Sequence, residues 1–143
     1  MFSIEEFKYY LGETILCYQL IEHDLKIIYA GMLKGNFNDN IAITNEEYHG
    51  LGQIVKALQE LENNNNKAFF SYADYKLLKS LARERNYFCH QCIIDFGYIQ
   101  NFLTSNEYKL ACNKLKKANS EILSLQKQTE KIRLFILKKL NRI

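Results

Sequence analysis

Apolar residues recur three or four positions apart over most of this chain, a spacing that places them on one face of an α-helix. Several of these periodic stretches are preceded by Ser or Thr with Glu three positions later, which is the pattern of an N-terminal capping box. The pairs are Ser3 and Glu6, Thr44 and Glu47, and Thr104 and Glu107. Because the chain also contains no Pro and only six Gly, the pattern predicts long uninterrupted helices and no sheet.

The predicted helices form one bundle. They cover residues 3–29, 44–62, 71–103 and 104 to the C-terminus, with residues 34–43 as a loop. Gly31 is the predicted stop of the first helix, and Ser71 is the predicted N-cap of the third. A chain of 143 residues, 48% of them hydrophobic, has the ordinary size of one domain with its own core. We therefore expect a single all-α domain, residues 1–143, built as an up-and-down four-helix bundle with a long C-terminal helix.

The last predicted helix differs from the others in charge. Ten of the 19 Lys and Arg residues follow residue 105, but only three of the 16 Asp and Glu residues do. Such asymmetry points to a polyanionic partner, although lysines on the outer face of an amphipathic helix can also be simply solvated. The apolar residues of this helix have a heptad-like spacing, which fits packing on a second chain or coverage of this chain's own core.

The third predicted helix contains a short stretch rich in charged and polar side chains. Asn86 and His90 are four positions apart and share a helix face, together with Arg83. Arg85 lies about 140° from His90 on an ideal helix, within the apolar stripe. Because an unpaired buried charge is costly, Arg85 needs a partner or a distorted helix. Glu22, which interrupts the apolar stripe of the first helix, is the candidate partner; alternatively, Glu22 lies in water at the edge of that stripe.

Arg85, Asn86 and His90, on the third helix of a small bundle with a further helix after it, resemble the signature of the HEPN (higher eukaryotes and prokaryotes nucleotide-binding) superfamily. The resemblance implies a metal-independent endoribonuclease without a cofactor, often a bacterial toxin or abortive-infection effector. It also implies a homodimer in which two motifs line one cleft, and an antitoxin protein as a possible further partner. In some relatives a partner nucleotidyltransferase modifies a Tyr two residues after the His, and Cys92 takes that position here.

The chemistry of these side chains fits RNA cleavage without a metal. His can transfer protons near neutral pH, Arg keeps its charge beside phosphate, and Asn can orient the imidazole or bind a phosphate oxygen. We therefore expect catalytic roles for Arg85, Asn86 and His90, with Glu22 and Arg83 in support. The expected RNA contacts on the last helix are Lys114, Lys116, Lys117, Lys127 and Lys131. The alternative function is a non-catalytic helical interaction module, such as an adaptor or an antitoxin partner.

Other kinds of site are disfavoured by the sequence. Cys89 and Cys92 have the C-x-x-C spacing of metal and redox sites, but they fall within a predicted helix and lack a second cluster. We therefore expect thiols in the core and no bound metal. The chain has no run of about 18 apolar residues, so we expect no membrane span. Its first residues lack the basic start of a signal peptide, so we expect a cytoplasmic protein with reduced cysteines.

Overall fold

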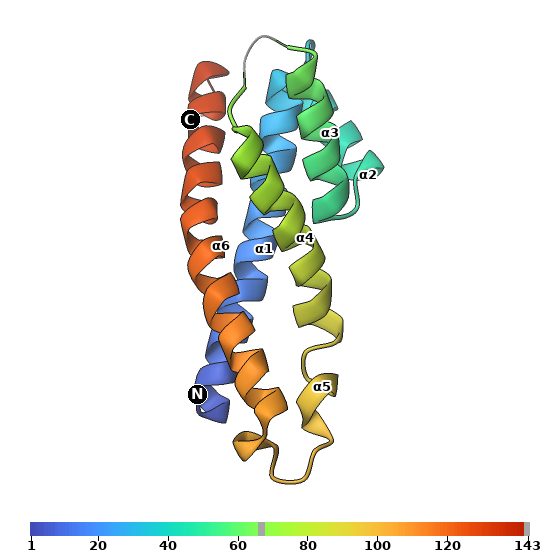
Figure 1. Ribbon diagram of the computed structural model, residues 1–143. Helices are drawn as coiled ribbons and strands as arrows, with labels where there is room; N and C mark the ends of the chain where they lie inside the picture. The colour runs from blue at the N-terminus through green and yellow to red at the C-terminus, as the bar shows by residue number, and fades with distance from the viewer. Residues whose placement is uncertain (66–67, 142–143) are drawn as a thin grey trace.

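The computed structural model describes residues 1–65 and 68–141, and every regular element in these two ranges is helical (Figure 1). The elements in chain order are α1 (Ile4–Met32), α2 (Phe37–Glu47), α3 (Leu51–Asn63), α4 (Tyr72–His90), α5 (Ile94–Gly97), the 3-10 turn η1 (Phe102–Thr104) and α6 (Asn106–Lys139). The predicted all-α class and the long C-terminal helix are therefore confirmed.

The two longest helices, α1 and α6, run parallel and pack along most of their length (Figure 1). Near their N-terminal ends, the Tyr108 hydroxyl donates a hydrogen bond to the backbone carbonyl of Phe2 at 2.9 Å. About three turns further along both helices, the side-chain amide of Asn119 donates a hydrogen bond to the Thr14 hydroxyl at 3.0 Å. The nearly equal sequence offsets of these two contacts, 106 and 105 residues, show that the two helices stay in register between them.

The core is formed by apolar side chains that four helices turn toward one another. Its fully buried members include Ile21, Leu25 and Ile28 of α1, Ile54 and Leu58 of α3, Leu78 and Leu81 of α4, and Leu115 and Ile122 of α6. These positions repeat three, four or seven apart within each helix, as the sequence pattern predicts. Within the described ranges, none of the helices is both long and apolar enough to cross a lipid bilayer.

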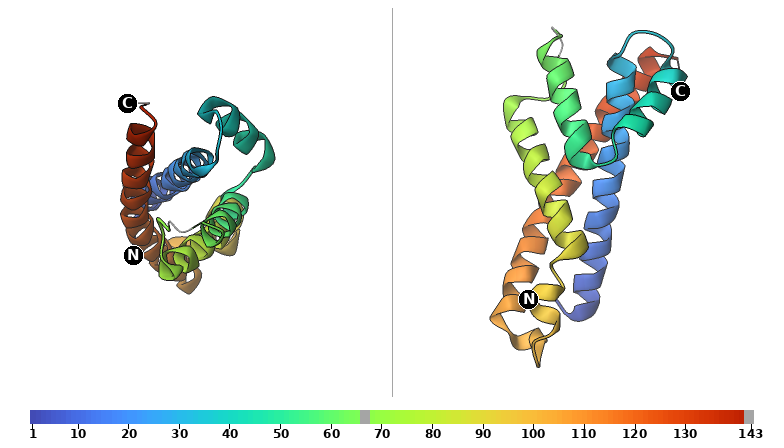
Figure 2. Two further views of the ribbon diagram at one scale, coloured as in Figure 1. Left: turned by 90° about the horizontal axis from the view of Figure 1, so that it is seen from above. Right: turned by 90° about the vertical axis from the view of Figure 1, so that its right-hand side faces the viewer.

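The segment predicted as a loop, residues 34–43, contains most of the short helix α2. The Asn36 side chain caps this helix by accepting a hydrogen bond from the Asp39 backbone N–H at 3.1 Å. Thr44, predicted to cap the second helix, lies inside α2 and donates its hydroxyl proton to the Asn40 carbonyl at 2.7 Å. The predicted capping box at Thr44 is therefore wrong, because a hydroxyl inside a helix can bond to the carbonyl four residues earlier. Figure 2 shows α2 lying outside the group of long helices.

The helix with the Arg-Asn-x-x-x-His stretch is shorter than predicted. It begins as expected with Ser71, whose hydroxyl accepts from the Asp74 N–H at 3.1 Å, but it ends at His90 and not near residue 103. The backbone N–H groups of Gln91 and Cys92 both donate to the Tyr87 carbonyl, at 2.8 and 2.9 Å, and this closes the last turn. The chain then reaches α6 through α5 and η1.

Candidate functional site

Four polar side chains line up on one face of α4. Lys79, Arg83, Asn86 and His90 are spaced four, three and four residues apart on a regular helix, so they fall within a narrow stripe. All four side chains are exposed. The stripe therefore presents two cations, an amide and an imidazole to solvent.

The stripe borders a groove of about 520 Å³ between α3 and α4. The two helices lie side by side, with the first turn of α3 against the second half of α4 (Figure 2). Lys56 of α3 and Lys79, Arg83 and Arg85 of α4 contribute cations to its lining, and no carboxylate is part of that lining. The groove thus carries four positive charges with no opposing charge of its own.

These four cations have no ion-pair partners among the described residues. The ion pairs in residues 1–65 and 68–141 join Lys26 to Glu22, and Arg133 to Asp24 and Glu130. In addition, no side chain caps the N-terminus of α3, whose first residues also line the groove. Free N–H groups at a helix N-terminus carry partial positive charge, which adds to that of the side chains.

The predicted pair between Glu22 and Arg85 does not form. Glu22 instead binds Lys26, one turn along α1, with 3.3 Å between the carboxylate and the ammonium group. An i,i+4 partner on the same helix requires no reach across the bundle. Arg85 needs neither a buried partner nor a distorted helix, because α3 begins only at Leu51 and Arg85 reaches the open groove, where it is partly exposed.

His90 lies beyond the groove. It is the last residue of α4, four positions after Asn86 on the same face, which corresponds to about 6 Å along the helix axis. Arg85 and Asn86 line the groove, whereas His90 does not. No hydrogen bond among the described residues links His90 to either of them. The structure therefore divides the predicted triad between a groove and the exposed end of its helix.

Exposed apolar residues follow His90 directly. Ile93 and Ile94 are 57% and 55% exposed, and Tyr98 is 90% exposed. All three belong to the connection between α4 and α6, which forms the end of the molecule nearest to His90 (Figure 1). Side chains of this kind are ordinary when they are scattered, but adjacent ones form a surface that another protein chain could cover.

The lysines predicted to bind RNA on the C-terminal helix do not form one track. Lys114, Lys116, Lys117, Lys127 and Lys131 are all exposed. On an ideal helix they spread over roughly 160° of the circumference. The Lys114 ammonium lies 4.6 Å from the centre of the Tyr87 ring, and that of Lys116 lies 4.9 Å from the centre of the Phe2 ring. Two of the five therefore already have aromatic contacts within the chain.

A partly buried carboxylate lies between α4 and α6. One carboxylate oxygen of Glu84 is buried without a hydrogen-bond partner. Burial raises the pKa of this carboxyl group, and the nearby carboxylate of Glu121 raises it further. Glu84 lines a cleft of about 260 Å³ together with Lys114 and Lys117. Lys117 acts in the opposite direction on the pKa, but burial has the largest effect.

The two cysteines of the C-x-x-C sequence have different environments. Cys92 is buried, and its thiol lies 3.4 Å from the Phe88 carbonyl, while Cys89 is exposed. The prediction of two core thiols is correct for Cys92 and wrong for Cys89, which lies in the last turn of α4 with its side chain exposed. Across residues 1–65 and 68–141 there is no group of three or more His, Cys, Asp or Glu placed to hold a metal ion.

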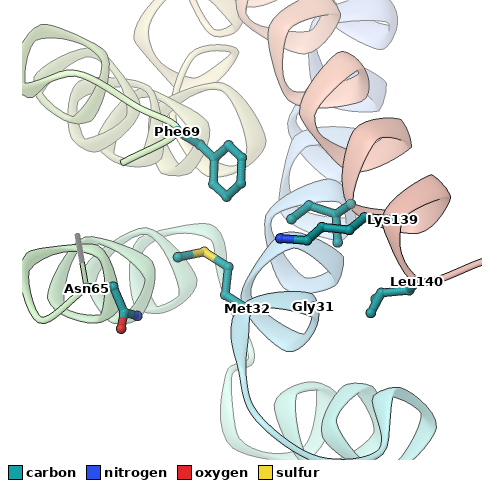
Figure 3. Close-up of a pocket in the computed structure, with 7 residues that line it drawn as sticks. Gly31, Met32, Asn65, Phe69, Lys139 and Leu140 are labelled. Atoms are coloured by element: carbon teal, nitrogen blue, oxygen red, sulfur yellow. The ribbon is translucent and has the colours of Figure 1, made fainter. Parts of the chain in front are cut away.

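Another cavity, of about 390 Å³, lies at the other end of the molecule, between the C-terminal ends of α1 and α6 and the connection from α3 to α4 (Figure 3). Met32 and Phe69 point into it, and Lys139 reaches toward it from α6. The sequence predicted that Gly31 stops the first helix, but α1 continues one residue further, to Met32. A Cβ atom at Gly31 would overlap Ile136 of α6, so this glycine permits the close contact of the two helices.

Sequence reasoning missed Lys56 and Lys79. Lys79 is seven residues before Asn86, so the helical spacing that grouped Arg83 with His90 also points to it. Lys56 gives no such signal, because its place in the groove depends on how α3 packs against α4. Gly52 lies where α3 faces α4, and a Cβ atom there would lie 3.9 Å from the Ala82 Cβ, an ordinary contact.

Comparisons of the chain with protein-family models, with curated proteins and with solved structures find no match. The function must therefore be argued from the side chains themselves. They offer a cationic groove that holds Arg85 and Asn86, with His90 one helical turn beyond it.

Proposed function

We propose that this protein is a metal-independent endoribonuclease of the HEPN type, cleaving single-stranded RNA with Arg85, Asn86 and His90. The observation that carries the proposal is the placement of Arg85 and Asn86 in a groove with four cations and no carboxylate, one turn before an exposed His90. A phosphodiester held in such a groove would meet an unpaired guanidinium and an amide, with an imidazole one helical turn further along the same helix face.

The reaction is an internal transfer at phosphorus. The ribose 2′-hydroxyl loses its proton to a general base and attacks the adjacent phosphorus, and the bond from phosphorus to the 5′-oxygen breaks as a general acid protonates that oxygen. The products are a 2′,3′-cyclic phosphate and a 5′-hydroxyl. His90 transfers a proton, Arg85 stabilises the added negative charge on phosphorus, and Asn86 positions the phosphate.

A homodimer supplies the second imidazole. One chain carries a single His at the motif, whereas the reaction needs both a base and an acid. The exposed Ile93, Ile94 and Tyr98 follow His90 in the connection to α6, and a second copy packed on them would bring its own His90 to the same cleft. In this proposal the HEPN-like bundle acts in the cytoplasm as a toxin or defence effector, with RNA as substrate and an antitoxin protein as a possible inhibitor.

A specific observation also favours a second candidate function. His90 lies outside the groove lining and has no hydrogen bond to Arg85 or Asn86. A chain with this arrangement could bind a partner through the groove without cutting it, as a non-catalytic interaction module. The two functions differ in one result, the appearance of cleaved RNA.

The test uses two oligonucleotides of the same sequence, one of RNA and one of 2′-O-methyl RNA, with purified protein and excess EDTA. We expect cleavage of the RNA alone, with 2′,3′-cyclic phosphate ends, because the methyl group removes the attacking hydroxyl. Cleavage of both oligonucleotides, or loss of cleavage on adding EDTA, would exclude the proposed chemistry. Absence of cleavage by a folded protein would favour the interaction module.

A further inference from the structure

We infer that the groove between α3 and α4 binds the phosphate backbone of single-stranded RNA, through Lys56, Lys79, Arg83 and Arg85, and that the lysines of α6 are not the RNA track. The inference rests on the proposed function for the identity of the ligand. It goes further by assigning the binding site to α3 and α4 and not to the C-terminal helix that the sequence indicates. It also includes two lysines, Lys56 and Lys79, that the motif does not contain.

The charge of the groove is the first argument. Four cationic side chains line about 520 Å³, and no carboxylate is present in the lining to neutralise them. None of the four forms an ion pair in the part of the chain that the structure describes. Like charges crowded in this way repel one another in the free protein, so a bound polyanion removes an unfavourable interaction as well as adding favourable ones.

The shape of the groove is the second argument. Gly52 lies in the first turn of α3 and has no side chain, so the floor of the groove stays open between Lys56 and Arg83. A Cβ atom at this position would have only Ala82 within 4 Å, at 3.9 Å. The backbone of a bound strand can therefore approach the floor closely while the longer cationic side chains reach it from both helices.

The direction of the groove is the third argument. The stripe from Lys79 through Arg83 and Asn86 to His90 covers twelve residues of α4, and the eleven steps between its ends measure about 16 Å along the helix axis. A strand whose phosphates follow Lys79 and Arg83 is thus led to His90, where the proposed chemistry takes place. The lysines of α6 give no such direction, because they spread around the outer face of their helix and Lys114 and Lys116 already contact aromatic rings.

The experiment places a carboxylate in the groove without removing any cation. Gly52→Glu adds a negative charge at the floor, and Gly52→Gln adds a neutral side chain of the same size as the matched control. Position 52 is exposed and helical, so both variants should fold, which circular dichroism and thermal melting check. Binding is measured by fluorescence anisotropy with a labelled 2′-O-methyl RNA, which cannot be cleaved, in the presence of EDTA.

We expect Gly52→Glu to weaken binding by at least about tenfold, and Gly52→Gln to weaken it much less, because a like charge opposes the phosphates. If Gln weakens binding as much as Glu, the added side chain blocks the groove, and this also places the RNA there. For the wild type, the logarithm of the binding constant should fall with the logarithm of salt concentration with a slope of about −3, from four contacts on a single strand.

A second pair of variants tests the alternative track. Lys56→Gln with Lys79→Gln should reduce the magnitude of the salt slope by about 1.4, at about 0.7 per contact, whereas Lys116→Gln with Lys127→Gln should leave it unchanged. Unchanged binding by Gly52→Glu, or loss of binding only in the α6 variant, would overturn the inference. Binding that depends on the groove, without any cleavage, would refute the proposed nuclease function but not the groove as the RNA-binding site. Cleavage that is insensitive to Gly52→Glu would refute the groove as the binding site but not the nuclease function.

Discussion

Thr129 of α6 donates a hydrogen bond to the buried carboxylate of Asp24 on α1, at 3.1 Å, and Arg133 lies 3.3 Å from the other oxygen of the same carboxylate. This contact links the C-terminal halves of α1 and α6. Arg133→Met keeps much of the side-chain volume but leaves the Asp24 charge without its cation. We expect the free energy of unfolding in urea to fall by about 2 kcal/mol. Lys131→Met, at an exposed position of the same helix, is the control and should change it by less than about 0.5 kcal/mol.

The partly buried carboxylate of Glu84 gives a pH-dependent prediction. Its pKa is raised by burial and by Glu121, so the folded protein binds this proton more tightly than the unfolded chain does. The free energy of unfolding contributed by Glu84 therefore rises as pH is lowered through the raised pKa toward the ordinary value. Glu84→Gln should stabilise the protein at pH 7 by about 1 kcal/mol, and this gain should disappear in acid. Melting curves from pH 7 to pH 4 check it, with the exposed Glu60→Gln as control.

A pH-independent gain, or none at all at neutral pH, would mean that the Glu84 carboxylate is not penalised in the folded state.

The proposed dimer depends on the exposed apolar residues after His90. The double variant Ile94→Asp and Tyr98→Ser places a charge and a small polar side chain at this surface. We expect a monomeric mass by light scattering at micromolar concentration, together with loss of RNA cleavage and nearly unchanged RNA binding. Tyr72→Ser is the control, because Tyr72 is 82% exposed at the other end of α4. A wild type that is itself monomeric and active would refute the two-histidine mechanism.

Arg85 separates the roles of charge and geometry. Arg85→Lys keeps the positive charge in the groove but removes the planar fork that contacts two phosphate oxygens. We expect RNA binding within about threefold of the wild type and cleavage slower by about 10²-fold, since the lost interaction is strongest with the charge that develops in the reaction. Equal losses of binding and cleavage would assign Arg85 to binding alone.

The helical periodicity predicted the class of fold. The exact ends of the helices depend on local hydrogen bonds, and the sequence signals only some of these. The Ser3 capping box forms as predicted, with both hydrogen bonds at 3.1 Å. The one at Thr44 does not, because the same residue spacing also occurs inside α2. The end of α4 at His90 depends on two backbone N–H groups that share the Tyr87 carbonyl, and no residue type in the sequence signals this arrangement.

The candidate site shows the same division. The stripe of Arg83, Asn86 and His90 follows from helical spacing alone. The solvent access of Arg85 does not, because it depends on where α3 begins relative to α4, and the apolar stripe suggested a buried charge. Lys56 joins the groove for the same reason. Which residues of two different helices meet depends on how the helices pack. Polar residues that meet across two helices are therefore harder to predict from sequence than those that share a face of one helix.

The measurement that tests the central claim most directly is the single-turnover rate of RNA cleavage in excess EDTA by the wild type, His90→Ala and His23→Ala, each confirmed to be folded. His23 is an exposed histidine of α1 and serves as the matched control. We predict that His90→Ala lowers the rate by about 10² to 10⁴, the usual cost of losing a general acid or base, while His23→Ala leaves it unchanged. Equal rates for the wild type and His90→Ala would contradict the assignment of His90 as the proton-transfer residue.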